Sequence, residues 1–245
     1  MLKHFNHFIS NHTIFELLLS FLNKPSSVTR SSNNKRLDFE AIYRIIATHF
    51  LCILTFIFLI HLLFYICGDY DIPQSSLQNI KNSNFESPFR VFALMCIWIP
   101  VLEECVFRLW INLGKKEVGI AFAMLYIGLY GHIFSHFSWH TVYRIAIAIT
   151  IFITIYKLEM LHNLFREKKN IALNIASYFS IIAFGLVHIT NYNSLTISQV
   201  PYIVFLILPQ LFAGIILAFI RLRYGFAFSI LYHVANNSIA FILTK

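Results

Sequence analysis

Charge is scarce in this sequence. Only 12% of its 245 residues are Asp, Glu, Lys or Arg, while 58% are hydrophobic, and the charged share is roughly half that of an average soluble domain. This composition argues against a soluble globular protein and indicates a chain that crosses the membrane several times. The apolar segments occupy most of the chain and leave no room for a soluble catalytic domain. Any chemistry must therefore be carried by membrane helices or by short loops.

Cysteine is also scarce, and no CxxC pattern occurs. The four cysteines are Cys52, Cys67, Cys96 and Cys105, and each lies in or beside an apolar segment. This pattern suggests neither a disulfide framework nor a thiolate metal site. The simplest interpretation is that these side chains pack in the apolar interior.

The apolar segments predict an all-α protein, a polytopic transmembrane helix bundle in the cell membrane. A bilayer core of ~30 Å requires ~20 apolar residues per helix. On this basis we expect seven spans, at about residues 45–67, 90–113, 118–135, 142–158, 171–190, 200–220 and 225–243. Residues 13–22 are expected to form an interfacial helix, and the alternative is an eighth, short span. Residues 1–44 would then form a cytoplasmic segment with a polar linker, and residues 45–245 the bundle.

The net charge of +8 could indicate nucleic-acid binding in a soluble protein, but here its distribution points to the lipid bilayer as partner. Lys and Arg are abundant in alternate loops, for example at Lys115, Lys116, Lys168 and Arg221, and rare in the others. By the positive-inside rule, this predicts a cytoplasmic N-terminus and an external C-terminus. The inverted orientation is the alternative. The sequence therefore does not determine whether a site would be accessible from the cytoplasm or from outside.

Two adjacent glutamates, Glu103 and Glu104, interrupt an apolar run and are the first candidates for a functional site, because carboxylates within a membrane helix are costly. Glu104 and Arg108 are four residues apart and are expected to pair on one helix face. Glu103 points about 100° away and is expected to be the unpaired carboxylate, free to act as a general base. Pro100 should disturb the helix one turn earlier. The alternative is that both glutamates only join a polar packing network.

Two later segments offer partners for these carboxylates. Phe184 and His188 lie four residues apart on one helical face, as do His233 and Asn237. A lone histidine in an apolar helix is most often a satisfied core residue. Polar groups on three spans, however, are hard to bury unless they converge.

These motifs resemble those of the CPBP intramembrane proteases, which include type II CAAX prenyl endopeptidases and bacteriocin-processing or self-immunity proteins. Glu103 to Arg108 is similar to the EExxxR motif of that family, Phe184 to His188 to FxxxH, and His233 to Asn237 to HxxxN. The motifs occur in the family's order, and the resemblance covers about residues 90–240.

The resemblance implies a role for each motif residue. Glu103 and His188 would activate a water molecule, and His233 and Asn237 would stabilise the oxyanion. Glu104 and Arg108 would support Glu103, and Phe184 would pack beside the reaction centre. The expected partner is a peptide or membrane-protein substrate.

Metal dependence is the main mechanistic alternative. Glu103, His188 and His233 would also satisfy a catalytic zinc ion with an open position. The carboxamide of Asn237 is a poor zinc ligand and a good oxyanion donor, which favours a mechanism without cofactor or metal. A further histidine series, His132, His136 and His140, is interpreted as a polar helix end rather than a metal site.

Two functions from other classes also fit the residues. One is a non-proteolytic membrane scaffold or bacteriocin self-immunity protein. The other is a proton-coupled transporter that uses Glu103 and Glu104 as a relay, although the sequence lacks the paired repeats typical of such transporters.

Overall fold

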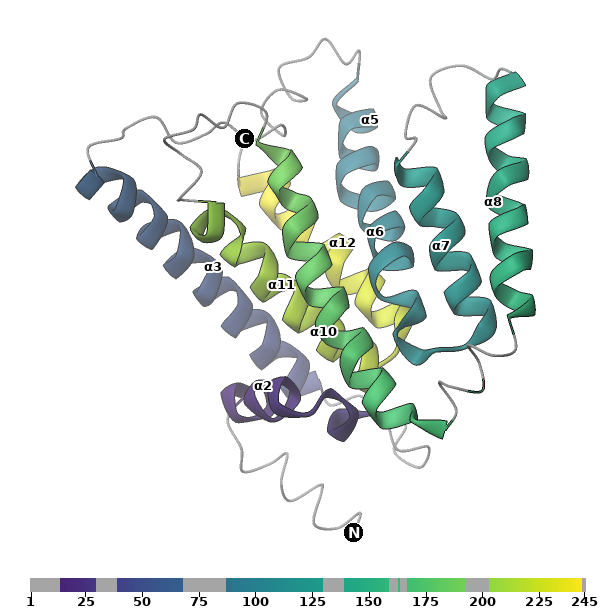
Figure 1. The fold of residues 1–245 in the computed structure, drawn as a ribbon. Coiled ribbons are helices and arrows are strands. Elements are labelled where there is room, and N and C mark those ends of the chain that lie inside the picture. Colours follow the sequence, from purple (N-terminus) through teal and green to yellow (C-terminus); the bar gives the residue numbers. More distant parts are fainter. Residues whose placement is uncertain are drawn as a thin grey trace. The chain divides into compact units, whose positions relative to one another are not determined.

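The structure is a computed structural model, and it describes residues 14–29, 39–67, 87–129, 139–158, 163, 167–192 and 203–243. Every element within these ranges is helical, and none of them is a strand, which confirms the all-α class (Figure 1). The elements in chain order are α2 (Ile14–Asn23), η1 (Pro25–Val28), α3 (Phe39–Cys67), α5 (Pro88–Phe92), η2 (Ala93–Trp98), α6 (Ile99–Phe107), η3 (Leu109–Asn112), α7 (Lys115–Leu129), α8 (Trp139–Lys157), α10 (Lys169–Val187), η4 (His188–Asn191), α11 (Ile203–Arg223) and α12 (Phe226–Leu243).

Four helical segments in the described part of the chain are long and apolar enough to cross a membrane. They are Tyr43–Leu63, Lys169–Asn191, Ile203–Arg223 and Phe226–Leu243. All seven predicted spans overlap described helices, but the count of seven stays a prediction, as does the inside-outside orientation. The segment expected at residues 13–22 is a helix, α2, and its interfacial position likewise stays a prediction.

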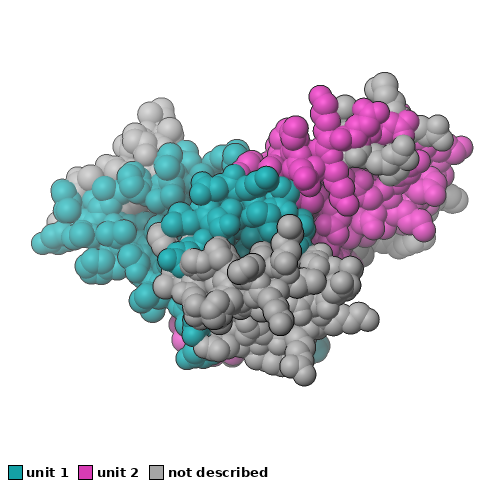
Figure 2. All heavy atoms as spheres, turned by 90° about the horizontal axis from the view of Figure 1, so that it is seen from below, with its two compact units in different colours: residues 1–91, 181–219 teal, residues 92–180, 220–245 magenta. Residues whose placement is uncertain are grey.

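The described chain divides into two compact units (Figure 2). Unit 1 comprises residues 1–91 and 181–219. In it, α2 turns Leu18 and Phe21 inward, and the ring of Phe21 meets that of Phe219 edge to face at 5.8 Å. Gly185 permits close contact between α10 and α11, because a Cβ atom there would overlap the side chain of Leu211. Small residues such as glycine let two membrane helices approach closely.

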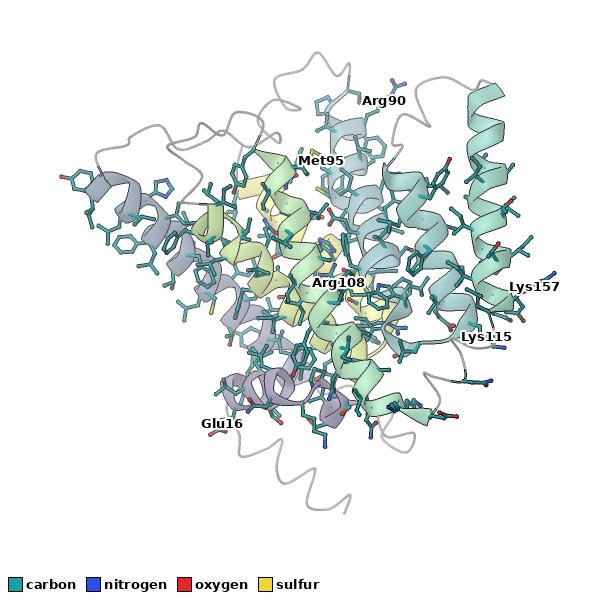
Figure 3. The ribbon with its side chains drawn as sticks, in the orientation of Figure 1. Glu16, Arg90, Met95, Arg108, Lys115 and Lys157 are labelled. Carbon is teal, nitrogen blue, oxygen red and sulfur yellow. The ribbon has the colours of Figure 1, made fainter. Side chains whose placement is uncertain are left out.

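Unit 2 comprises residues 92–180 and 220–245 and contains the adjacent glutamates Glu103 and Glu104. Helices α7 and α8 pack as a pair, and Gly119 of α7 lies against the ring of Phe152 of α8. Lys115 and Lys157 lie at the same end of this pair (Figure 3), as expected for two loops on one side of the membrane.

Residues 88–107 form a continuous helical run whose hydrogen-bond register changes at η2. This element is one turn of π-helix, and the N–H of Ile99 donates to the carbonyl of Leu94, five residues earlier. Pro100 follows at the start of α6. Proline has no N–H, and its ring clashes with the carbonyl four residues before it in a regular α-helix. The expected disturbance one turn before the glutamates is therefore confirmed and takes the form of a π turn.

Candidate active site

The expected pair on α6 is present. Arg108 Nη1 lies 3.2 Å from Glu104 Oε1, and both side chains are fully buried. Glu104 lies in α6, and Arg108 directly follows the helix. Figure 3 labels Arg108 and also Met95, which lies in η2 of the same helical run. Because an isolated charge is expensive to bury and a paired one much less so, each side chain makes the burial of the other tolerable.

Glu104 also binds two residues of α12. The hydroxyl of Ser229 donates to Glu104 Oε2, and His233 Nδ1 lies 3.0 Å from Glu104 Oε1. A carboxylate only accepts hydrogen bonds, so Nδ1 of His233 carries the hydrogen in this contact. Both oxygens of Glu104 are thus held from two helices, which fixes the orientation of its carboxylate.

Glu103 is not the unpaired carboxylate that its helix face suggests. Its Oε2 lies 3.4 Å from Nε2 of His233, so one imidazole lies between both glutamates. The prediction was wrong because it considered α6 alone, whereas the ring comes from α12, 129 residues beyond Glu104. The two carboxylates still differ in access, since Glu103 is 22% exposed and Glu104 is fully buried.

Asn237 lies one turn beyond His233 on α12 and binds the π turn. Its Nδ2 donates to the carbonyl of Met95 at 3.2 Å, and Cys96 Sγ donates to the backbone carbonyl of Asn237 at 3.6 Å. An amide nitrogen carries two hydrogens, so the bond to Met95 leaves one for another acceptor.

Four residues of α12 that bind or pack against the run of residues 88–107 recur every four positions. They are Ser229, His233, Asn237 and Phe241, the last of which meets the ring of Phe92 at 5.6 Å. Sequence analysis identified only the middle two. Extending the four-residue spacing back from His233 would have found Ser229, because residues at that spacing share a helix face.

The C-terminal end of α6 is capped by side chains. Ser180 Oγ donates to the carbonyl of Phe107 at 2.5 Å, and Arg221 donates to the carbonyls of Arg108 and Leu109 at 3.1 and 3.4 Å. The last carbonyls of a helix have no partner within it. Ser180 supplies a donor to the carbonyl of Phe107, and Arg221 adds a second donor to the carbonyl of Arg108, which also accepts from the N–H of Ile111 at 3.3 Å. Arg221 was expected to be a loop cation, but it is buried, and its guanidinium lies 5.2 Å from the centre of the Phe226 ring.

Phe184 and His188 belong to unit 1. His188 Nδ1 donates to the carbonyl of Phe184 at 2.6 Å, and the two ring centroids are 4.5 Å apart. Both side chains are buried, which agrees with the expected shared face. Glu103 belongs to unit 2, and the approach of His188 to it stays a prediction.

A metal site requires ligand side chains in a defined geometry. Within these ranges, no group of three or more His, Cys, Asp or Glu side chains is arranged to hold a metal ion. Cys52, Cys96 and Cys105 are reduced cysteines that form no disulfide within the described ranges. Of the further histidine series, His140 lies in the first turn of α8, whereas His132 and His136 lie outside the described residues.

Comparison with known proteins gives one match. The sequence model of the family described as type II CAAX prenyl endopeptidase Rce1-like matches residues 85–239, a range that contains all three motifs. No curated protein matches the chain. No solved structure matches it either. The family match covers more than half of the chain and confirms the resemblance to the CPBP proteases. The protein therefore belongs to the type II CAAX prenyl endopeptidase Rce1-like family, a family of membrane proteases.

Proposed function

We propose that this protein is an intramembrane endopeptidase in which Glu103 is the general base. One observation carries this assignment, which is the difference in access between the adjacent glutamates. Glu104 is fully buried and bound to Arg108, Ser229 and His233, whereas Glu103 is 22% exposed. A general base must reach the water molecule that it deprotonates. Glu103 meets that requirement, and Glu104 is suited to orient His233.

The proposed reaction begins when water attacks the scissile carbonyl carbon and Glu103 accepts a proton from it. His188 orients the same water molecule. The donor bond of its Nδ1 to the Phe184 carbonyl leaves a lone pair on Nε2 of the neutral ring. The carbonyl oxygen becomes negative as the carbon–oxygen bond to water forms. Asn237 donates its second amide hydrogen to that oxygen.

His233 is proposed to carry the proton from Glu103 to the leaving nitrogen. Its Nδ1 donates to Glu104, so Nε2 of the neutral ring can accept the proton that Glu103 has taken, across 3.4 Å. The N–H formed there stabilises the oxyanion. The peptide C–N bond then breaks, and the leaving nitrogen takes up the proton.

The proposed substrate class is a prenylated peptide with a C-terminal CAAX sequence, as in the name of the family. The proposed mechanism uses no metal ion, because the amide of Asn237 is a poor zinc ligand but a good donor to an oxyanion. The proposed setting is the cell membrane, with the substrate reached within the bilayer.

Cleavage of a farnesylated CAAX peptide by the purified full chain in liposomes, followed by mass spectrometry, tests the proposal. We expect Glu103→Gln to lower kcat ~10²–10⁴-fold, the range of a lost general base, with unchanged thermal stability. Glu104→Gln is measured alongside, because it removes the same charge from the adjacent glutamate and so separates the role of Glu103 from a general effect of charge removal. Cleavage by Glu103→Gln within about tenfold of wild type would contradict the role of Glu103. If cells kept the protein's function with this variant, a scaffold or self-immunity role would be favoured.

Metal dependence is tested on the same peptide. We expect activity to persist after exhaustive chelation. Loss of activity on chelation, with recovery on addition of one equivalent of zinc, would favour the zinc mechanism instead.

A further inference from the structure

The carbonyl of Met95 lacks the backbone donor that a regular helix would supply. In an α-helix that donor is the N–H of Ile99, but in the π turn this N–H binds Leu94 instead. In a continued π-helix the donor would be residue 100. Residue 100 is proline and has no N–H. The change of register and the proline together leave this carbonyl available to a side chain.

The side chain that uses it is Asn237. Its Nδ2 lies 3.2 Å from the Met95 carbonyl oxygen. The next residue of the π turn, Cys96, donates a hydrogen bond from its thiol to the backbone carbonyl of Asn237. Met95, Cys96 and Pro100 are all buried. The carboxamide of Asn237 is thus held at one of its two hydrogens, and the bond restricts the rotation of the amide plane.

We propose that Pro100 and the π turn it follows are a positioning device for the Asn237 carboxamide. Pro100 acts by withholding an N–H, which keeps the Met95 carbonyl free to orient the amide so that its second hydrogen faces the reacting oxygen. This inference rests on the proposed function, since it assigns Pro100 a role through the proposed oxyanion donor. Pro100 touches no reacting atom and is a positioning residue.

Pro100→Ala tests the inference because alanine restores the missing N–H. Whether the turn keeps its π register or relaxes to α-helix, Met95 gains a backbone donor that competes with Asn237. We expect kcat on the farnesylated CAAX peptide to fall roughly 10- to 100-fold, as for a misplaced catalytic group. KM should stay within about twofold and the melting temperature should not fall, because alanine favours helix more than proline does. Pro100→Ser, which also restores the N–H, is measured alongside.

A double-mutant cycle with Asn237→Ala separates positioning from a general structural role. If Pro100 acts through Asn237, then Pro100→Ala has no further effect on kcat in the Asn237→Ala background. Pro209→Ala, at a proline inside α11, is the matched control and should combine additively with Asn237→Ala. A kcat for Pro100→Ala within twofold of wild type, or an effect that adds fully to that of Asn237→Ala, would overturn the inference.

The side-chain amide signal of Asn237 provides a readout that needs no substrate. In ¹⁵N-labelled protein, Pro100→Ala should shift this signal and speed its hydrogen exchange, while Pro209→Ala should leave it unchanged. An unchanged signal in Pro100→Ala would overturn the inference even if the wild type cleaved no CAAX peptide. An inactive wild type, or an active Glu103→Gln variant, would instead contradict the proposed function.

Discussion

His188 and His233 each form a hydrogen bond through Nδ1, but the acceptor is a backbone carbonyl for His188 and a carboxylate for His233. His188 donates from Nδ1 to the carbonyl of Phe184, four residues earlier on its own helix, at 2.6 Å. His233 donates from Nδ1 to the carboxylate of Glu104, 129 residues earlier and on another helix, at 3.0 Å. A neutral ring that donates from Nδ1 carries its lone pair on Nε2.

One of these contacts is local to a single helical segment, and the other depends on the packing of two helices. The contact of His188 forms whenever its helix forms, because a side chain lies over the turn that precedes it. The contact of His233 requires α12 to pack on α6, and it belongs to a buried polar cluster in which Arg108 and Ser229 also bind Glu104. We therefore expect the His233 group to dominate stability, and the His188 contact to matter mainly for activity.

The largest expected effect is that of Glu104→Ala. It would leave the guanidinium of Arg108 buried without this carboxylate, and loss of one partner from a buried pair costs ~3–5 kcal/mol. Thermal unfolding in detergent, followed by tryptophan fluorescence, measures the effect. Glu104→Gln keeps the side-chain size but also removes the charge, so comparison of the two variants separates the loss of the ion pair from the loss of side-chain volume. Equal destabilisation by Glu103→Ala would remove the distinction between the two glutamates.

Ser229→Ala is expected to have the next largest effect. Its hydroxyl donates to a buried carboxylate, and hydrogen bonds to charged groups contribute about 1.5–3 kcal/mol. Ser177→Ala is a matched control, because Ser177 is equally buried but donates only to the carbonyl of Leu173 on its own helix. Unfolding free energies from denaturant titration should separate the two variants. A Ser177→Ala cost as large as that of Ser229→Ala would contradict the charge-based explanation.

In unit 1, Gly185→Ala tests the packing next to the His188 contact. The new methyl group would overlap the side chain of Leu211, and overpacking of this kind costs about 1–3 kcal/mol. The double variant with Leu211→Ala should recover part of that stability in the same thermal assay. If the double variant were as unstable as the sum of both single variants, the overlap would not be the cause.

The smallest stability effect is expected for His188→Gln. The variant loses one hydrogen bond to a neutral carbonyl, which contributes about 0.5–1.5 kcal/mol, while cleavage of the farnesylated peptide should be lost. Thermal unfolding and peptide turnover are measured on the same preparation. Destabilisation as large as that of Glu104→Ala would show that the His188 contact also supports the fold.

Much of the helical architecture was predictable from the sequence. Apolar runs predict helices because backbone groups in lipid must be satisfied within the segment, and all seven predicted spans overlap described helices. Pairs at four-residue spacing were predictable for the same local reason, as with Glu104 and Arg108. Pro100 also predicted a disturbed helix, because the missing N–H belongs to the residue itself.

The contacts between helices could not be predicted in this way. The sequence alone determined the helices, the pairing of Glu104 with Arg108 and the shared face of Phe184 and His188, since each depends on residues within one or two turns. Only the tertiary structure placed His233 between both glutamates, Ser229 on Glu104 and Asn237 on the π turn. It also buried Arg221 against the end of α6. These contacts depend on which faces of α6, α11 and α12 meet, and the periodicity of a single helix does not specify its neighbour.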